Sequence, residues 1–277
     1  MEINEKILLD FRNFLIEEEK SSDTISKYLS NIKEFCSWKE DKECTKQLLL
    51  DYKKYLLCKN LNPVTINAKL SSLNGLFKFL NHSEYCVKFL KIQQKVFRSE
   101  DKELSKRDYE TLVNTAYAQN KEQLALILQT IGSTGIRISE LKYITRDTVE
   151  NGKVCIHLKG KERTILIPKT LKKKLLPFIK KNNITEQVFV TKNNTPISRH
   201  QVWKQMKTLC KQAHIDESKV FPHNLRHLFA ITFYKINKDI AKLADILGHS
   251  SINTTRIYLI SSGKEHLCLL DKMKLVC

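Results

Sequence analysis

Four short clusters in the C-terminal two-thirds of the chain hold the kinds of side chain that break a phosphodiester without a metal. Such a reaction needs a nucleophile that becomes an oxyanion, cationic donors for the phosphoryl oxygens, and an acid for the leaving oxygen. A tyrosine, serine or histidine can attack, two arginines can donate bidentate hydrogen bonds, and a lysine or histidine can supply the proton. The residue types therefore permit nucleophilic chemistry on phosphate, provided that the fold brings the clusters together.

The first two clusters contain an arginine–glutamate pair and a basic turn. Arg137 and Glu140 are three residues apart and are expected on one helix face. The preceding Thr134-Gly135 step would let a backbone and a helix N-terminus approach a phosphate. Lys159 follows a predicted strand, where a flexible ammonium could protonate a leaving oxygen. Taken singly, these residues are better explained as a surface ion pair and a solvated lysine.

The third cluster is a histidine–arginine pair that follows a Phe-Pro step. His223 and Arg226 stand at positions i and i+3, so the two side chains project from the same face of a helix. A phosphate could be held between them. A cap or a salt bridge within a core explains this pair equally well.

The fourth cluster contains a histidine and a tyrosine near the C-terminus. An amphipathic helix is predicted to close near Gly248, directly before His249. Tyr258 is expected on the next short helix, which Asn253 or Thr254 would cap. A lone tyrosine on an amphipathic helix is more often an interface residue with a solvated hydroxyl. The joint presence of all four clusters, in this order, favours the catalytic interpretation.

The elements that must position these clusters begin with a helical segment. Apolar residues recur every three or four positions, as on the buried face of an amphipathic helix, over 3–20, 25–35, 44–58 and 66–80. The polar run 21–23 supplies capping side chains, and Asn62-Pro63 is a typical helix start. Four short helices predict a compact all-α bundle over residues 1–90.

A linker and a mixed segment complete the chain. Residues 91–105 are polar and aperiodic, as in an interdomain linker, whose basic start could track phosphates or simply be solvated. Asn151-Gly152 is a strong signal for a two-residue hairpin turn. Alternating residues at 154–158 and a return strand at 164–167 predict a small antiparallel β-sheet within residues 106–277. Elsewhere this second segment has helical patterns, including 106–118 and 124–132, so the fold is expected to be mainly α.

Charge identifies a class of partner. The chain has 48 lysines and arginines against 30 acidic residues, a net charge of +18. Self-repulsion of this size points to a polyanionic partner, although a lysine-rich composition alone would produce the same balance. A membrane span of about 20 apolar residues is missing from the sequence, and its start lacks a signal-peptide pattern, so a cytoplasmic location is expected. Its eight cysteines lack a Cys-x-x-Cys pair, which argues against a zinc site and a disulfide framework.

With these motifs in order, the sequence resembles the tyrosine recombinase family, also called the phage integrase family, and in particular its Xer-type members. The strings that carry the resemblance are NPVTINAKLSSLNGLFKFL (62–80), KELSKRDYETLV (102–113), TGIRISEL (134–141), LKGKERTILIP (158–168), HNLRH (223–227) and LGHSSINTTRIYL (247–259). The resemblance implies a helical, SAM-like core-binding domain over 1–90, a linker over 91–105, and a mixed α/β catalytic domain over 106–277.

The resemblance also implies a role for each residue of the four clusters. Tyr258 would be the nucleophile, and Arg137 and Arg226 would clamp the non-bridging phosphate oxygens. The remaining assignments are Lys159 as general acid, His223 as proton partner and phosphate ligand, His249 as a hydrogen-bond donor to the phosphate, Glu140 as support behind the site, and His227 as a structural residue. Lys161 is the alternative general acid, because the hairpin tip at 159–163 is one residue shorter than in many family members.

The implied function is site-specific DNA recombination through a 3′-phosphotyrosyl intermediate, without ATP, metal or another cofactor. Its partners would be double-stranded DNA core sites and three further copies of the chain in a synaptic tetramer. DNA contacts are expected from Lys69, Ser72, Lys95, Arg98, Lys161, Arg163 and Arg199. Integration, excision and resolution of dimers or cointegrates all stay open. Alternative functions are type IB topoisomerase-like relaxation and non-catalytic DNA binding on a recombinase scaffold.

Overall fold

The computed structural model describes residues 3–92, 103–158, 161–249, 251–256, 258 and 271–273. The chain divides into two compact units, Met1–Gln94 and Lys95–Cys277. Helices dominate both units, and the strands of the described part form a two-stranded antiparallel sheet, which confirms the predicted fold class. Within the same part, each helix is too short or too polar to cross a membrane.

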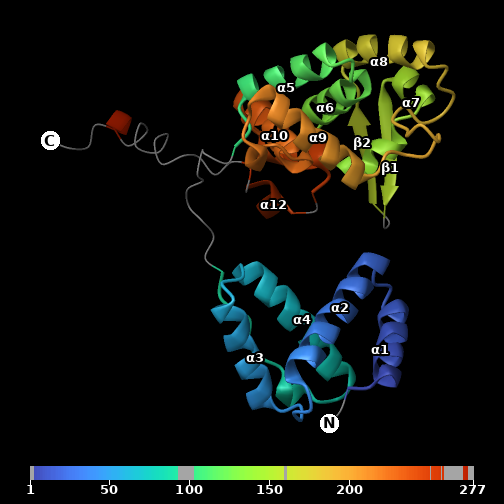
Figure 1. Ribbon diagram of the computed structural model, residues 1–277. Coiled ribbons are helices and arrows are strands. Elements are labelled where there is room, and N and C mark those ends of the chain that lie inside the picture. The colour runs from blue at the N-terminus through green and yellow to red at the C-terminus, as the bar shows by residue number, and fades with distance from the viewer. Residues whose placement is uncertain are drawn as a thin grey trace. The chain divides into compact units, whose positions relative to one another are not determined.

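The N-terminal unit is a bundle of helices around one apolar core (Figure 1). Its elements are α1 (Glu5–Glu17), α2 (Ser22–Lys39), α3 (Lys46–Cys58), α4 (Pro63–Phe79) and the 3-10 turn η1 (Ser83–Tyr85). The predicted starts of two helices are confirmed, because the Ser21 hydroxyl caps α2 and the Asn62 side chain caps α4, which begins with Pro63. The core is rich in aromatic side chains, including Phe11, Phe35, Tyr52 and Phe77.

The C-terminal unit is built around α6 (Glu122–Thr134), a helix buried along most of its length. This helix contacts α5 (Lys106–Ala118), α8 (Lys169–Lys181), α9 (Arg199–Ala213) and α10 (Pro222–Asn237) (Figure 1). Smaller elements surround this core: η3 (Ile138–Tyr143), α7 (Arg146–Asn151), η4 (Glu217–Lys219), α11 (Ile240–Leu247) and α12 (Ile252–Arg256). Because α10 contacts both α6 and α11, it brings the ends of these two helices close to each other.

The β-hairpin differs from its prediction in two respects, the first being that the return strand begins at Lys161 and not at Thr164. Strands β1 (Lys153–Leu158) and β2 (Lys161–Leu166) pair in register from Lys153 opposite Leu166 to Leu158 opposite Lys161. The predicted hairpin turn at Asn151-Gly152 is wrong. Asn151 ends α7, and Gly152 closes that helix in the left-handed conformation, with φ of 72°. Positive φ at Gly152 therefore serves a helix C-cap instead of a β-turn.

One local prediction near the C-terminal motifs is also wrong. Helix α12 already begins at Ile252, so Asn253 and Thr254 lie inside it and do not cap it. Tyr258 lies two residues beyond Arg256, the last residue of α12, and Ile257 between them is outside the described residues.

Candidate active site

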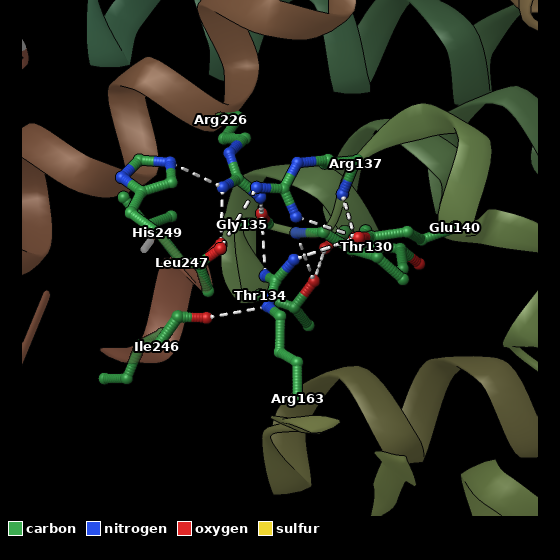
Figure 2. A network of polar contacts seen from close by, with 12 residues as sticks. Thr130, Thr134, Gly135, Arg137, Glu140, Arg163, Arg226, Ile246, Leu247 and His249 are labelled. Carbon is green, nitrogen blue, oxygen red and sulfur yellow. Dashed lines mark hydrogen bonds and ion pairs between the residues drawn. The ribbon is translucent and has the colours of Figure 1, made fainter. Parts of the chain in front are cut away.

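The site lies where two helices end. Gly135 closes α6 and Gly248 closes α11, both in the left-handed conformation, with φ of 64° and 62°. The last carbonyls of a helix lack intrahelical partners and carry its partial negative charge. At these two ends the carbonyl oxygens point toward arginine side chains (Figure 2). The Thr134-Gly135 step thus belongs to the C-terminus of α6, and the next helical element, η3, begins at Ile138.

Arg226 is buried between the two helix ends. Its Nη1 donates to the Gly135 oxygen at 2.5 Å, and its Nη2 donates to the Leu247 oxygen at 2.7 Å. The same Nη2 lies 3.0 Å from Nε2 of His249. These contacts fix the guanidinium plane before any ligand arrives, which is the preorganisation that charge stabilisation in a transition state requires.

Glu140 is a buried carboxylate between two further arginines. Its side chain is 3% exposed. It accepts hydrogen bonds from the backbone and Nη1 of Arg137, at 2.8 and 2.9 Å, and from Nη1 of Arg163, at 3.2 and 2.9 Å. The Arg137 side chain is 40% exposed, so one side of its fork is held by Glu140 while much of its surface stays open to a ligand.

The local charge balance favours an anion. The site holds three arginines and one glutamate, and Glu140 contacts two of the three, Arg137 and Arg163. Burial lowers the pKa of Arg226 to about 10, with the charges of Arg137 and Arg163 adding to the effect. Tyr258 acts in the opposite direction, because the negative charge of its ionised phenol and a hydrogen bond to the phenol oxygen raise the pKa of Arg226. The helix carbonyls offset part of the repulsion among the arginines. An entering phosphate would relieve the remainder, because its charge compensates the buried cations.

His249 is held as a neutral ring between a donor and an acceptor. An arginine can only donate, so Nε2 of His249 must accept from Arg226. The proton then resides on Nδ1, which lies 2.8 Å from the Thr255 hydroxyl and donates to it. Burial, followed by the charge of Arg226 and its neighbouring cations, lowers the pKa of His249 to about 4. In this arrangement both ring nitrogens are engaged with protein groups.

Tyr258 is 6% exposed and is surrounded by histidine rings. Its ring centroid lies 5.1 Å from that of His227, 5.7 Å from that of His249 and 5.9 Å from that of His223. His227 is buried, and its Nε2 lies 3.7 Å from a carboxylate oxygen of Glu103. His223 is exposed near the start of α10, one turn before Arg226. The chain thus brings the tyrosine, three histidines and the arginine cluster into one site.

Other predicted residues lie elsewhere or outside the described part. Lys159, Lys95 and Arg98 are outside the described residues, as is the side chain of Lys161. Arg199 is exposed at the first position of α9. Lys69 is paired with Glu34, which leaves 13% of its side chain accessible.

Two of the predicted DNA contacts are wrong. Ser72 has no exposed surface, because its hydroxyl accepts from Asn31 and donates to the Ala68 carbonyl within the helical bundle. Arg163 is likewise buried against Glu140 and cannot reach a DNA strand in this conformation. Sequence reasoning also missed Thr255, a buried partner of His249, because nothing marks this threonine among the polar residues around it.

The depressed pKa of His249 predicts how folding depends on pH. The unfolded chain binds a proton there near the ordinary value of about 6.5, whereas the folded chain does so near 4. Stability should therefore fall as pH decreases from 6.5 to 4, because the unfolded state binds more protons in this window. Thermal midpoints measured across this range should show a weaker pH dependence for His249→Gln than for the wild type. Identical slopes would contradict a neutral, half-buried His249.

Comparisons with known proteins cover both units. The chain matches the phage integrase family over residues 102–265 and the phage integrase N-terminal SAM-like domain over residues 8–84. Tyrosine recombinase XerA of Pyrococcus furiosus is 28% identical over 270 residues, which are 95% of this chain and 92% of that protein. TnP I resolvase of Bacillus thuringiensis is 28% identical over 286 residues, covering 96% of this chain and 98% of that protein.

Solved structures share the fold. The Tn1549 transposon integrase in complex with circular intermediate DNA aligns with a TM-score of 0.70 at 17% identity, over 91% of this chain and 94% of that chain. The XerH recombinase bound to its difH substrate in a pre-cleavage complex aligns with a TM-score of 0.68 at 20% identity, over 84% of this chain and 74% of that chain.

Proposed function

Because this chain belongs to the phage integrase family and is a tyrosine recombinase of the Xer type, we propose that Tyr258 is the nucleophile with which it cuts DNA. The protein is a site-specific recombinase that cleaves and rejoins DNA strands. The observation that carries the assignment of the nucleophile is the position of Tyr258, buried next to Arg226 and ringed by histidines of the same chain.

The proposed step exchanges one phosphodiester for another. The Tyr258 oxygen attacks phosphorus, the bond to the 5′ oxygen breaks, and a 3′-phosphotyrosine forms. Lys159, favoured over Lys161, gives its proton to the leaving 5′ oxygen. The reverse attack by a 5′ hydroxyl rejoins a strand, and because the bond energy is conserved in the phosphotyrosine, neither ATP nor a metal is required.

Arg137 and Arg226 hold the non-bridging oxygens during this step. A guanidinium donates two parallel hydrogen bonds to a phosphate, and its charge stabilises the charge that develops in the transition state. The exposed side of the Arg137 fork and the fixed plane of Arg226 supply these donors. His223, exposed near the start of α10, serves as proton partner and phosphate ligand.

The other residues act around this clamp. Glu140 supports Arg137 from the buried side, and His227 packs against the Tyr258 ring as a structural residue. His249 hydrogen-bonds the phosphate, for which its Nε2 must exchange Arg226 for a phosphate oxygen and gain a proton. The negative charge of the phosphate favours that protonation, because it opposes the neighbouring cations that depress the pKa of the free histidine.

We assign the larger organisation by the same reasoning. Residues 1–90 form a core-binding domain, 91–105 a linker, and 106–277 the catalytic domain. Four copies assemble on two double-stranded core sites to exchange strands, and the net charge of +18 is matched by the DNA that they enclose. Since the substrate is cellular DNA, the protein acts in the cytoplasm.

Trapping the covalent intermediate tests this function. Suicide oligonucleotides, each nicked near a candidate cleavage position, are tiled across the DNA that flanks the gene and incubated with the protein in EDTA without ATP. We expect a protein–DNA adduct that survives a denaturing gel, and exchange of strands between two copies of the cleaved site. Tight binding without an adduct would leave only non-catalytic DNA binding. Adducts with relaxation of supercoils but without exchange would indicate a topoisomerase.

A further inference from the structure

Arg163 is a buried arginine on the hairpin that the proposed mechanism does not use. It lies on β2 opposite the buried Ile156, and its side chain is 8% exposed. Its Nη1 donates to both oxygens of Glu140, its Nε donates to the Ile246 oxygen at 3.1 Å, and its Nη2 lies 3.5 Å from the Gly135 oxygen. One guanidinium thus joins the hairpin to Glu140 and to the ends of α6 and α11 (Figure 2).

The contacts of Glu140 connect Arg163 to Arg137. The Glu140 carboxylate divides its hydrogen bonds between these two arginines, with Oε1 and Oε2 each contacting both residues. A carboxylate with one partner could rotate about its terminal torsion, whereas a carboxylate held from two sides cannot. Both guanidinium groups donate to the same carboxylate, that of Glu140. The position of the Arg137 fork therefore depends on Arg163.

A second observation concerns Gly248, the residue that closes α11 directly before His249. A Cβ on this residue would overlap Cδ of Arg163 and lie 3.0 Å from its Nε. The glycine thus leaves room for the Arg163 stem to pass the end of α11. Its neighbours Ile246 and Leu247 accept from Arg163 and Arg226, so the arginine stem also braces the segment that leads to His249.

We propose that Arg163 is a positioning residue for strand cleavage, which acts by holding Glu140 and the end of α11 so that Arg137 and His249 meet the scissile phosphate in the reactive geometry. The inference rests on the function proposed above. A purely structural role would explain the burial of Arg163, but it would not predict that the effect of a change at Arg163 depends on Arg137. This dependence separates the two explanations.

A double-mutant cycle measures that dependence. Arg163→Lys keeps the charge but cannot contact Glu140, Ile246 and Gly135 at once, because an ammonium lacks the planar fork. We expect single-turnover cleavage of the suicide substrate to fall about 10²-fold, since a small displacement of a positioned group costs this much. DNA affinity should stay within threefold. In the background of Arg137→Lys, the same change should reduce the remaining rate by less than about fivefold, because coupled residues are non-additive.

Two further comparisons control the cycle. Arg146→Lys alters an exposed arginine–glutamate pair of the same unit, and its cleavage rate should equal that of the wild type. Gly248→Ala and Gly152→Ala place an alanine in the same left-handed conformation, with φ of 62° and 72°, but only the first meets Arg163, since the space around Gly152 is open. Gly248→Ala should therefore cleave at least about tenfold more slowly than Gly152→Ala, at equal thermal stability or after correction for the folded fraction.

Different outcomes of these experiments would overturn the positioning role of Arg163 and the proposed recombinase function. If wild-type protein forms the adduct and Arg163→Lys cleaves within threefold of it, or if the effects at 137 and 163 multiply, the positioning role is overturned while the recombinase function stands. If Arg163→Lys does not fold by circular dichroism, the glycine pair decides, and equal cleavage by both alanine variants overturns the role. Absence of an adduct from the wild type would overturn the function itself.

Discussion

Replacing Tyr258 with phenylalanine is expected to eliminate the covalent protein–DNA adduct and to reduce strand cleavage by at least about 10⁴-fold, the size of effect seen when a nucleophile is removed. The change deletes one oxygen from a ring that is packed among His223, His227 and His249, so the packing of the site is retained. Cleavage is measured by single turnover on the suicide substrate, and binding is measured by gel shift. Binding should be unchanged within about threefold, because the proposed role of the hydroxyl is attack on phosphorus in the transition state and not ground-state binding of DNA.

A matched tyrosine controls for the loss of a phenolic hydroxyl. Tyr234 packs against the same small apolar cluster as Tyr258, and Tyr234→Phe should cleave at the wild-type rate. An adduct that persists in Tyr258→Phe would assign the nucleophile to another residue. Equal loss in both variants would indicate a folding defect of this region instead of lost chemistry.

Arg226→Lys is expected to have the second largest effect, a loss of about 10²- to 10³-fold in cleavage, as for removal of a donor to a developing oxyanion. Arg226 is buried and its two terminal nitrogens contact Gly135, Leu247 and His249. A lysine has a single nitrogen and cannot reproduce these contacts together with a bidentate contact to phosphate. Cleavage is again measured by single turnover, and thermal melting reports whether the variant stays folded.

The paired change Arg137→Lys distinguishes chemistry from packing at the same site. Arg137 is far more exposed than Arg226, so its replacement should leave thermal stability closer to that of the wild type while cleavage still falls severely. The two variants should therefore share a cleavage defect but differ in stability. Near-normal turnover in either one would contradict the proposed phosphate clamp.

Local sequence was sufficient to predict helix ends where a residue type has one common structural role. Ser21 and Asn62 cap helices as predicted, and Gly248 closes α11. In each case the signal and its physical cause lie within one helical turn, so distant residues do not change the outcome. The same locality explains why the bounds 106–118 of α5 could be predicted from its apolar period.

Prediction from sequence failed where the same short sequence is compatible with two different local structures, or where the partner of a residue is distant in the chain. Asn-Gly tolerates positive φ, which suits a hairpin turn and a helix C-cap equally, and Gly152 serves the second use. Arg163 follows Glu162 in a polar, alternating segment that suggests exposure, because arginine is rarely buried without a partner. Its partner Glu140 lies 23 residues earlier in the chain, so only the tertiary fold reveals the pair. Ser72 was misassigned for the same reason, since its partner Asn31 belongs to a different helix.

The most direct test of the central assignment is to locate the covalent bond. The adduct formed on a suicide oligonucleotide is digested with nuclease and protease, and tandem mass spectrometry identifies the amino acid that carries the residual nucleotide. We predict a nucleotide linked through its 3′ phosphate to the oxygen of Tyr258. A nucleotide attached to any other side chain, or a linkage through a 5′ phosphate, would contradict the proposed chemistry.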